Sequence, residues 1–139
     1  MSISIEDKLA IHELLGRAAL GYDEREVDML ASCFAQGAEF SMRIAGGDLI
    51  GPFVGRDEIM GLMTGSMDTQ TDVRRHVISN IVFTSSNTDA VEVVSNLTLL
   101  ATENGNIELL SAGIYRDKVT LSDGEWRISH RHLDLDKAY

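Results

Sequence analysis

Apolar residues in the first part of the chain recur at the spacing of an amphipathic helix. Between residues 5 and 22 they fall three or four positions apart, which predicts that this stretch is helical. Asp23, with Glu26 three residues later, forms a capping-box pattern and predicts the start of a second helix, which Gly37 ends. A third helix is predicted after Gly55. The helices are therefore expected in the N-terminal half of the chain.

The second half of the chain alternates between apolar and polar residues, which is the period of a half-buried β-strand. Asn104-Gly105 and Asp123-Gly124 are dipeptides typical of type I′ hairpin turns. With a third turn between residues 85 and 89, they divide this half into four long strands, predicted at residues 73–85, 89–103, 106–122 and 125–135. Two shorter strands are predicted before the third helix, at residues 38–44 and 48–53. We expect one α+β domain spanning residues 1–139, an antiparallel meander with helices on one face.

The hairpins also predict which side chains share a face, because directly opposed residues point the same way. Counting back from the two turns places polar residues among apolar ones on one face, which suits a binding pocket: Asn96, Thr98, Ser111, Tyr115, His130 and His132. The other face is predicted to be apolar and buried by a second subunit: Leu97, Leu99, Leu110, Ala112, Ile114 and Leu133. The count also allows the two faces to exchange roles, and it leaves open which face His76 joins.

The charge of the chain limits the partners that it can have. The 139 residues carry a formal net charge of −10, and the longest basic run is Arg74-Arg75. Binding to nucleic acid or to an anionic membrane needs clustered lysine and arginine, so neither partner is expected. The N-terminus lacks the basic and apolar regions of a signal peptide, and no apolar run approaches the ~20 residues of a membrane span. We therefore expect a cytoplasmic protein.

Five short motifs follow one another along the chain in a characteristic order. They are Tyr22-Asp23, Val27-Asp28-x-Leu30-Ala31-x-x-Phe34-Ala35, Ala38-x-Phe40, Arg75-His76-x-x-x-Asn80 and Asp123-Gly124-x-Trp126-Arg127-Ile128. Their order and spacing resemble the SnoaL-like branch of the NTF2-like superfamily, and the resemblance covers nearly the whole chain. It implies a cone, in which a strongly curved antiparallel sheet wraps around a pocket closed by N-terminal helices.

The resemblance also implies a chemistry. Within this branch the spacing is similar to that of scytalone dehydratase and hexachlorocyclohexane dehydrochlorinase, which are cofactor-free lyases that use an Asp–His pair. The matching positions here are Asp23 and His76. The dehydratase's second catalytic histidine has no counterpart, and Ala18 stands where the dehydrochlorinase has a lysine. We therefore expect this chain to share the Asp–His base of these lyases but not the groups that activate their leaving groups. The resemblance does not identify the substrate.

An imidazole paired with a carboxylate suits proton abstraction near neutral pH, because the unperturbed pKa of histidine is ~6.5. The carboxylate fixes the tautomer and stabilises the imidazolium that forms. Two simpler roles are also consistent with the sequence. Asp23 fits a helix cap, and His76 fits an ordinary strand residue. His130 and His132 alternate like a metal-binding pair, but the sequence places no third ligand beside them, so neither a metal nor another cofactor is expected.

The resulting hypothesis is a cofactor-independent lyase, of the dehydratase, elimination or retro-aldol type, or an isomerase. Its substrate would be a small hydrophobic molecule, aromatic or polycyclic, and its assembly a homodimer, with a homotrimer also open. Two alternatives are a non-catalytic ligand-binding domain and a structural subunit resembling the small subunit of ring-hydroxylating dioxygenases. Residues expected to contact the substrate are Tyr22, Met63, Asn80, Asn96, Ser111, Tyr115 and His132.

Overall fold

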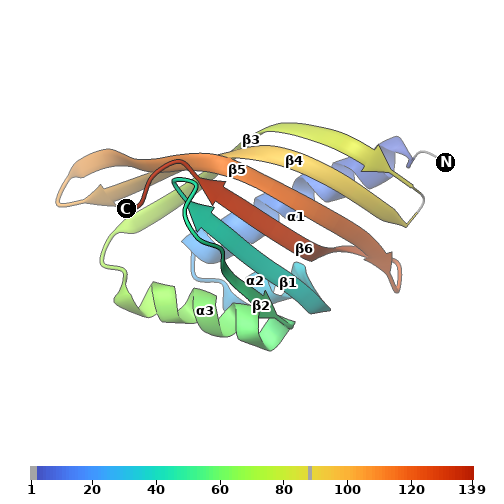
Figure 1. Ribbon diagram of the computed structural model, residues 1–139, viewed down its shortest axis with the longest axis horizontal. Helices are drawn as coiled ribbons and strands as arrows, with labels where there is room; N and C mark the ends of the chain where they lie inside the picture. The colour runs from blue at the N-terminus through green and yellow to red at the C-terminus, as the bar shows by residue number, and fades with distance from the viewer. Residues whose placement is uncertain (1–2, 88) are drawn as a thin grey trace.

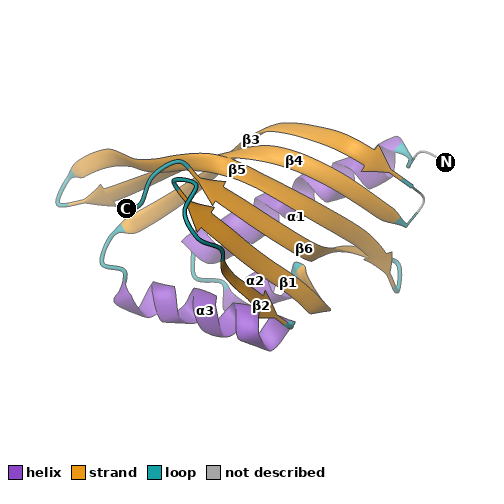
Figure 2. Cartoon of the chain, viewed as in Figure 1, coloured by secondary structure: helices purple, strands orange, loops and turns teal. Residues whose placement is uncertain are grey.

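Residues 3–87 and 89–139, which the computed structural model describes, form one six-stranded sheet and three helices (Figure 1). The strands lie in the order β2-β1-β6-β5-β4-β3. The helices are α1 (Ile5–Asp23), α2 (Val27–Ser32) and α3 (Arg56–Thr69); the strands are β1 (Phe34–Ile44), β2 (Ile50–Val54), β3 (Val73–Ser86), β4 (Ala90–Glu103), β5 (Asn106–Ser122) and β6 (Glu125–Leu135). The sheet is curved, and α1 packs against β3 while α3 packs against β1, so the helices close the space inside the curve (Figure 2). Among the described residues, no helix is both long and apolar enough to cross a membrane.

The four long strands lie where the alternating pattern predicts them. β3 begins at Val73 and β6 ends at Leu135. The turns at Asn104-Gly105 and Asp123-Gly124 have positive φ angles at both residues, between 52° and 80°, as a type I′ turn requires. Both hairpin predictions are confirmed.

Two features near the start of the sheet differ from the sequence prediction. The second helix ends at Ser32 and not at Gly37, and β1 begins at Phe34. Phe34 is buried and pairs with Ile128 of β6, so burial of its ring within the sheet overrides the helical spacing around it. β1 and β6 run parallel, which makes the sheet mixed and not wholly antiparallel.

Two β-bulges decide which side chains face the helices. Leu110 is the extra residue of the first, between β4 and β5, and Ser129 is the extra residue of the second, between β5 and β6. Each shifts the register by one position, and such a shift moves every later side chain to the other face. The predicted pairing of Thr98 with Ser111 is therefore wrong, since Thr98 lies opposite Ala112.

The face that packs against the helices consequently differs from the predicted one. Leu97, Leu99 and Leu133, predicted to form an apolar surface that a second subunit buries, lie instead in the core of the chain itself. Ala112 and Ile114, predicted beside them, lie on the outer face of the sheet, because β5 alternates buried and less buried positions from Ser111 onward. Counting pairs outward from a turn assumes that no strand has an extra residue, so it cannot reveal a bulge.

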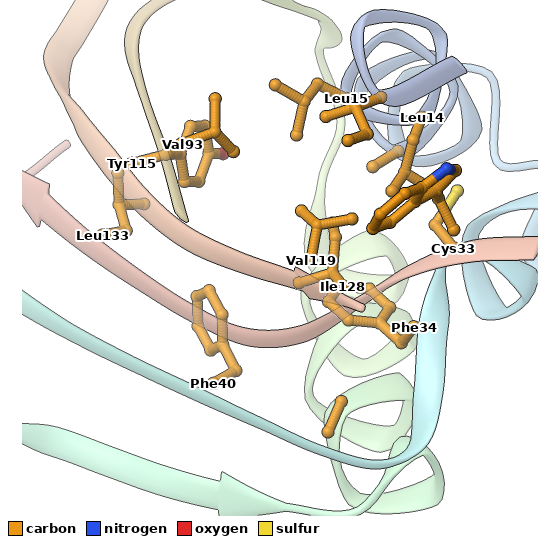
Figure 3. Packing of buried hydrophobic residues seen from close by; sticks show 14 of the residues in the cluster. Leu14, Leu15, Cys33, Phe34, Phe40, Val93, Tyr115, Val119, Ile128 and Leu133 are labelled. Carbon is orange, nitrogen blue, oxygen red and sulfur yellow. The ribbon is translucent and has the colours of Figure 1, made fainter. Parts of the chain in front are cut away.

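The core lies between α1 and the inner face of the sheet. In Figure 3, Leu15 of α1 lies across from Val119 and Ile128, all three of which are fully buried. The indole Nε1 of Trp126 donates a hydrogen bond to Asp7 Oδ1 at 3.0 Å, which ties the first turn of α1 to β6. Helix α1 is thus fixed to the sheet by apolar packing along its length and by a polar contact at its start.

At Gly113 of β5, the neighbouring strand β6 leaves no room for a side chain. A Cβ atom there would lie 2.3 Å from the carbonyl oxygen of Asp134, a backbone atom. We expect Gly113→Ala to lower the free energy of unfolding by about 1–3 kcal/mol, because the two strands must separate. Urea unfolding measures the change. Gly65→Ala is the matched control: a Cβ atom meets nothing within 4 Å there, so this helix substitution should stabilise by ~0.5–1 kcal/mol. Equal effects of the two substitutions would contradict the close approach.

Candidate active site

Asp23 and His76 meet where α1 ends against β3. Nδ1 of His76 lies 2.6 Å from Oδ1 of Asp23, and the backbone N–H of His76 donates to Oδ2 of the same carboxylate at 2.7 Å. Both side chains are largely buried, 5% exposed for Asp23 and 13% for His76. The predicted contact is confirmed, and the carboxylate is held at both of its oxygens.

This contact fixes the orientation of the imidazole ring. A carboxylate accepts hydrogen bonds, so Nδ1 of His76 carries the proton that it donates to Asp23, and Nε2 of the neutral ring is left as an acceptor. Tyr22 packs its ring edge-on against the imidazole, with the ring centroids 5.0 Å apart. The Tyr22 hydroxyl donates to the side chain of Gln70, which holds the tyrosine in place. Burial raises the pKa of Tyr22, so the hydroxyl remains protonated at neutral pH.

His76 lines a cavity of about 130 Å³ between the helices and the inner face of the sheet. Most of the wall is apolar and comes from both layers: Leu30, Phe34, Phe40, Leu62, Met63 and Ile78. Among the described residues, Nε2 of His76 has no hydrogen-bond partner, so it is available to a molecule bound in this cavity. An apolar chamber with one accepting nitrogen suits proton transfer from a small hydrophobic compound.

A second polar group lies in the same cavity and was not expected from the sequence. Nε and Nη2 of Arg131 donate to the two oxygens of Asp117, at 2.7 Å and 3.0 Å, and the side chains are only 7% and 0% exposed. The Arg131 guanidinium also stacks on the ring of Tyr115, with Cζ 3.9 Å from the ring centroid. Both Arg131 and Tyr115 line the cavity. The bulge at Ser129 turns Arg131 inward, whereas a count without the bulge would place it on the outer face.

Burial controls the ionisation of this second group. Burial alone lowers the pKa of Arg131, but the Asp117 carboxylate raises it above the ordinary value, so the guanidinium stays charged. Burial raises the pKa of Tyr115 to about 12, although the neighbouring Arg131 charge lowers it, and so the hydroxyl is a hydrogen-bond donor throughout the neutral range. The Asp23 carboxylate also raises this pKa, which places Tyr115 within electrostatic reach of the Asp23–His76 pair.

The profile of the SnoaL-like domain family matches residues 4–132. The chain belongs to the SnoaL-like family. A protein of unknown function from Nostoc punctiforme has the same fold, with a TM-score of 0.83, 23% identity, and coverage of 98% of this chain and 96% of that one. A candidate scytalone dehydratase from Novosphingobium aromaticivorans aligns with a TM-score of 0.77, 23% identity, and coverage of 94% and 85%. The β subunit of a candidate aromatic-ring-hydroxylating dioxygenase from the same organism aligns with a TM-score of 0.79 and 19% identity. The alignment covers 94% of this chain and 89% of that one.

At these identities the solved structures establish the cystatin-like, NTF2-like fold that this SnoaL-like chain shares with them, and not its chemistry. No functionally curated protein matches the chain. The family prediction is confirmed, and the function rests on the residues of the site itself.

Three of the seven residues predicted to contact the substrate line the cavity with His76: Tyr22, Met63 and Tyr115. The other four do not. Ser111 is buried on the inner face, but its hydroxyl donates to the carbonyl of Lys137 at 2.7 Å and it does not reach the cavity. Asn80 is exposed, with a φ of 55°, in an irregular stretch of β3 that turns its side chain away.

Asn96 and His132 were predicted in the pocket and lie on the outer face instead. The bulge at Leu110 puts Asn96 opposite Ile114, and the bulge at Ser129 puts His132 opposite Arg116, both on the outer face. The His132 ring makes contacts there with Ser41 Oγ at 2.7 Å and with Asp134 Oδ1 at 2.9 Å. The capping role considered for Asp23 is also wrong. Helix α1 continues through Asp23, and the residue preceding α2 is Glu26, which makes no side-chain capping bond.

Tyr115 gives the SnoaL-like chain a distinct alkaline response. Its pKa of about 12 in the folded state exceeds the unfolded value of 10, so the unfolded chain loses the proton first and stability falls as the pH rises from 10 towards 12. The loss from this residue is about 2–3 kcal/mol. We expect Tyr115→Phe to flatten this fall in urea unfolding free energy, with little change at pH 7. An identical pH slope in both proteins would show that the Tyr115 hydroxyl is not sequestered.

Proposed function

We propose that this protein is a cofactor-independent lyase or isomerase in which the Asp23–His76 pair is the general base. The observation that carries the proposal is the 2.6 Å contact between Nδ1 and the Asp23 carboxylate, with Nε2 available in an apolar cavity. A solvated or purely structural histidine needs neither the cavity nor a carboxylate held at both oxygens. The arrangement supports chemistry that begins with removal of a proton from the bound molecule.

In this mechanism Nε2 of His76 takes a proton from a carbon of the substrate. The imidazolium that forms keeps its Nδ1–H on the Asp23 carboxylate, which stabilises the new charge. The electron pair of the broken C–H bond becomes a double bond and expels a leaving group from the next carbon, which gives elimination. Return of the proton to a different carbon gives isomerisation. Positioned base catalysis of this kind contributes roughly 10²–10⁴ in rate.

The size of the cavity narrows the substrate class. A cavity of about 130 Å³ is close to the ~150 Å³ in which an engineered apolar cavity binds benzene. We therefore favour substrates whose buried part is a single six-membered ring over polycyclic compounds. Met63 and its apolar neighbours would contact the faces of such a ring.

The test replaces each member of the pair. We expect His76→Ala and Asp23→Asn each to lower turnover at least ~10²-fold on a substrate found by screening single-ring ketols and alcohols for elimination or isomerisation. Asp23→Asn should also lower stability by about 1–3 kcal/mol, because an amide cannot accept from both His76 donors. His12→Ala, an exposed histidine of α1 outside the cavity, is the matched control and should keep full turnover.

Two results would separate this proposal from the other candidate, a non-catalytic ligand-binding domain. Full turnover in His76→Ala would exclude His76 as the base. Ligand binding with no turnover in the wild-type protein, together with weaker binding in His76→Ala, would favour the binding domain. The apolar wall of the cavity is the feature that supports this second candidate, since it binds small molecules without any base.

We also propose that the protein is a homo-oligomer that buries the outer face of the sheet. Val94, Ala112 and Ile114 lie there on the adjacent strands β4 and β5, and in the part of the chain that the structure describes no helix covers this face (Figure 1). A two-fold dimer is the commonest closed assembly and is favoured over a trimer. We expect Ile114→Lys to lower the molar mass measured by sedimentation at micromolar concentration. A monodisperse 15.3 kDa species for the wild-type chain would overturn this proposal.

A further inference from the structure

Two hydrogen-bond donors in the cavity lack an acceptor. Within residues 3–87 and 89–139, neither the Tyr115 hydroxyl nor Nη1 of Arg131 has a hydrogen-bond partner. Over the same residues, Ser95 Oγ is the one side-chain atom that is both fully enclosed and without a partner. The two donors are therefore not sealed in the core but open to the cavity that their side chains line.

Both donors are held in fixed positions. Asp117 binds the Nε and Nη2 edge of the guanidinium, so Nη1 lies on the opposite edge. Cζ of Arg131 lies over the Tyr115 ring, 3.9 Å from its centroid, so the guanidinium and the tyrosine ring are in direct contact. Arg131 and Asp117 are nine-tenths buried or more, and two hydrogen bonds to Asp117 hold the guanidinium in one orientation. The Tyr115 and Arg131 donors are therefore already in place before a charge develops on a bound molecule, which is what electrostatic stabilisation of that charge requires.

The net charge of Tyr115, Arg131 and Asp117 together indicates which kind of ligand atom would accept their hydrogen bonds. Asp117 already neutralises Arg131, and Tyr115 is a neutral donor, so the group as a whole carries no net charge. A carboxylate would bring its full charge into the apolar cavity on binding, before any reaction. A carbonyl oxygen enters the cavity uncharged, and the two donors stabilise the negative charge that develops on it during the reaction.

We propose that Tyr115 and Arg131 form an oxyanion-binding site, and that the substrate is a single-ring carbonyl compound whose oxygen binds these donors. The substrate assignment rests on the proposed function of His76, whereas the oxyanion site does not. Asp117 is a positioning residue, since it acts by holding the guanidinium. The cavity then contains a base on β3 and an oxygen-binding group on β5 and β6.

The reaction steps balance with these residues alone. Nε2 of His76 removes a proton from the carbon next to the carbonyl, and the C–H electron pair forms a carbon–carbon double bond. The carbonyl π electrons move to oxygen, which becomes an enolate bound by the Tyr115 O–H and an Arg131 N–H. When the carbonyl re-forms, the electrons expel hydroxide from the β-carbon, and that hydroxide leaves as water with the proton from His76. Loss of one oxyanion donor typically lowers turnover 10²–10³-fold.

The test measures the ionisation of a bound phenol, which resembles an enolate. The probe is 3,5-difluorophenol, whose ionisation is followed by fluorine NMR in the free and bound states. Burial in an apolar cavity alone raises the pKa of a phenol, whereas donors aimed at its oxygen lower it. We expect the pKa of the bound phenol to lie below that of the free phenol. We also expect it to bind at least tenfold tighter than 3,5-difluorotoluene, which has the same shape without the oxygen.

Variants assign the effect to individual residues. Tyr115→Phe keeps the ring and should raise the pKa of the bound phenol by about one unit, which is a tenfold loss of phenolate affinity. The double variant Arg131→Met with Asp117→Leu removes the ion pair together, avoids an uncompensated buried carboxylate, and should have an effect at least as large. Asn96→Ala, exposed on the outer face, is the control and should leave the shift unchanged.

Each outcome decides between the claims. A pKa of the bound phenol above that of the free phenol, or no binding of either compound at millimolar concentration, overturns the oxyanion site. A lowered value that disappears in His76→Ala and persists in Tyr115→Phe also overturns it, since the oxygen then binds at the histidine. A lowered value that persists in His76→Ala and is lost in Tyr115→Phe supports it. That result stands even if His76 proves not to be the base, because the measurement involves no turnover.

Discussion

The contact between the end of α1 and the edge of the sheet is the constraint on which the site depends. β3 is an edge strand of the sheet formed by the described residues, so backbone N–H groups on its outer side need acceptors from outside the sheet. Asp23 supplies one for His76 and, with its other oxygen, binds the imidazole of the same residue. A single carboxylate therefore fastens the helix layer to the sheet and sets the tautomer of the histidine. Structure and chemistry are coupled at this point.

A different constraint, the two bulges, determines which side chains of β5 and β6 point to the concave face of the sheet. Without them, Arg131 and Leu133 would face outward and His132 would point into the cavity. With them, the strands bring an ion pair, a tyrosine and apolar side chains to the concave side. An extra residue is a small change in length, but it decides which half of the side chains of β5 and β6 meets a ligand.

These two constraints explain what could be predicted from the sequence. The strands and the type I′ turns follow from local signals, namely alternation and the Asn-Gly and Asp-Gly dipeptides. The proximity of Asp23 and His76 followed from motifs whose order is typical of a family. The placement of Asn96 and His132 failed, because register was counted from turns as though no residue were inserted. The Arg131–Asp117 pair was missed for the same reason, although two opposite charges on adjacent strands are a signal that a count including a bulge would use.

The apolar strand between the two polar groups is as important as the groups themselves. β4 separates β3, which carries His76, from β5, which carries Tyr115 and Asp117. Its inward side chains there are uncharged: Leu97 and Leu99 are apolar, and Ser95, which pairs with Tyr115, carries a neutral hydroxyl. A carboxylate on this strand would compete with Asp23 for the imidazole, and a cation would oppose formation of the imidazolium. Because β4 offers neither, Asp23 stays bound to His76 and Asp117 stays bound to Arg131, so a proton acceptor and a pair of donors coexist in one cavity.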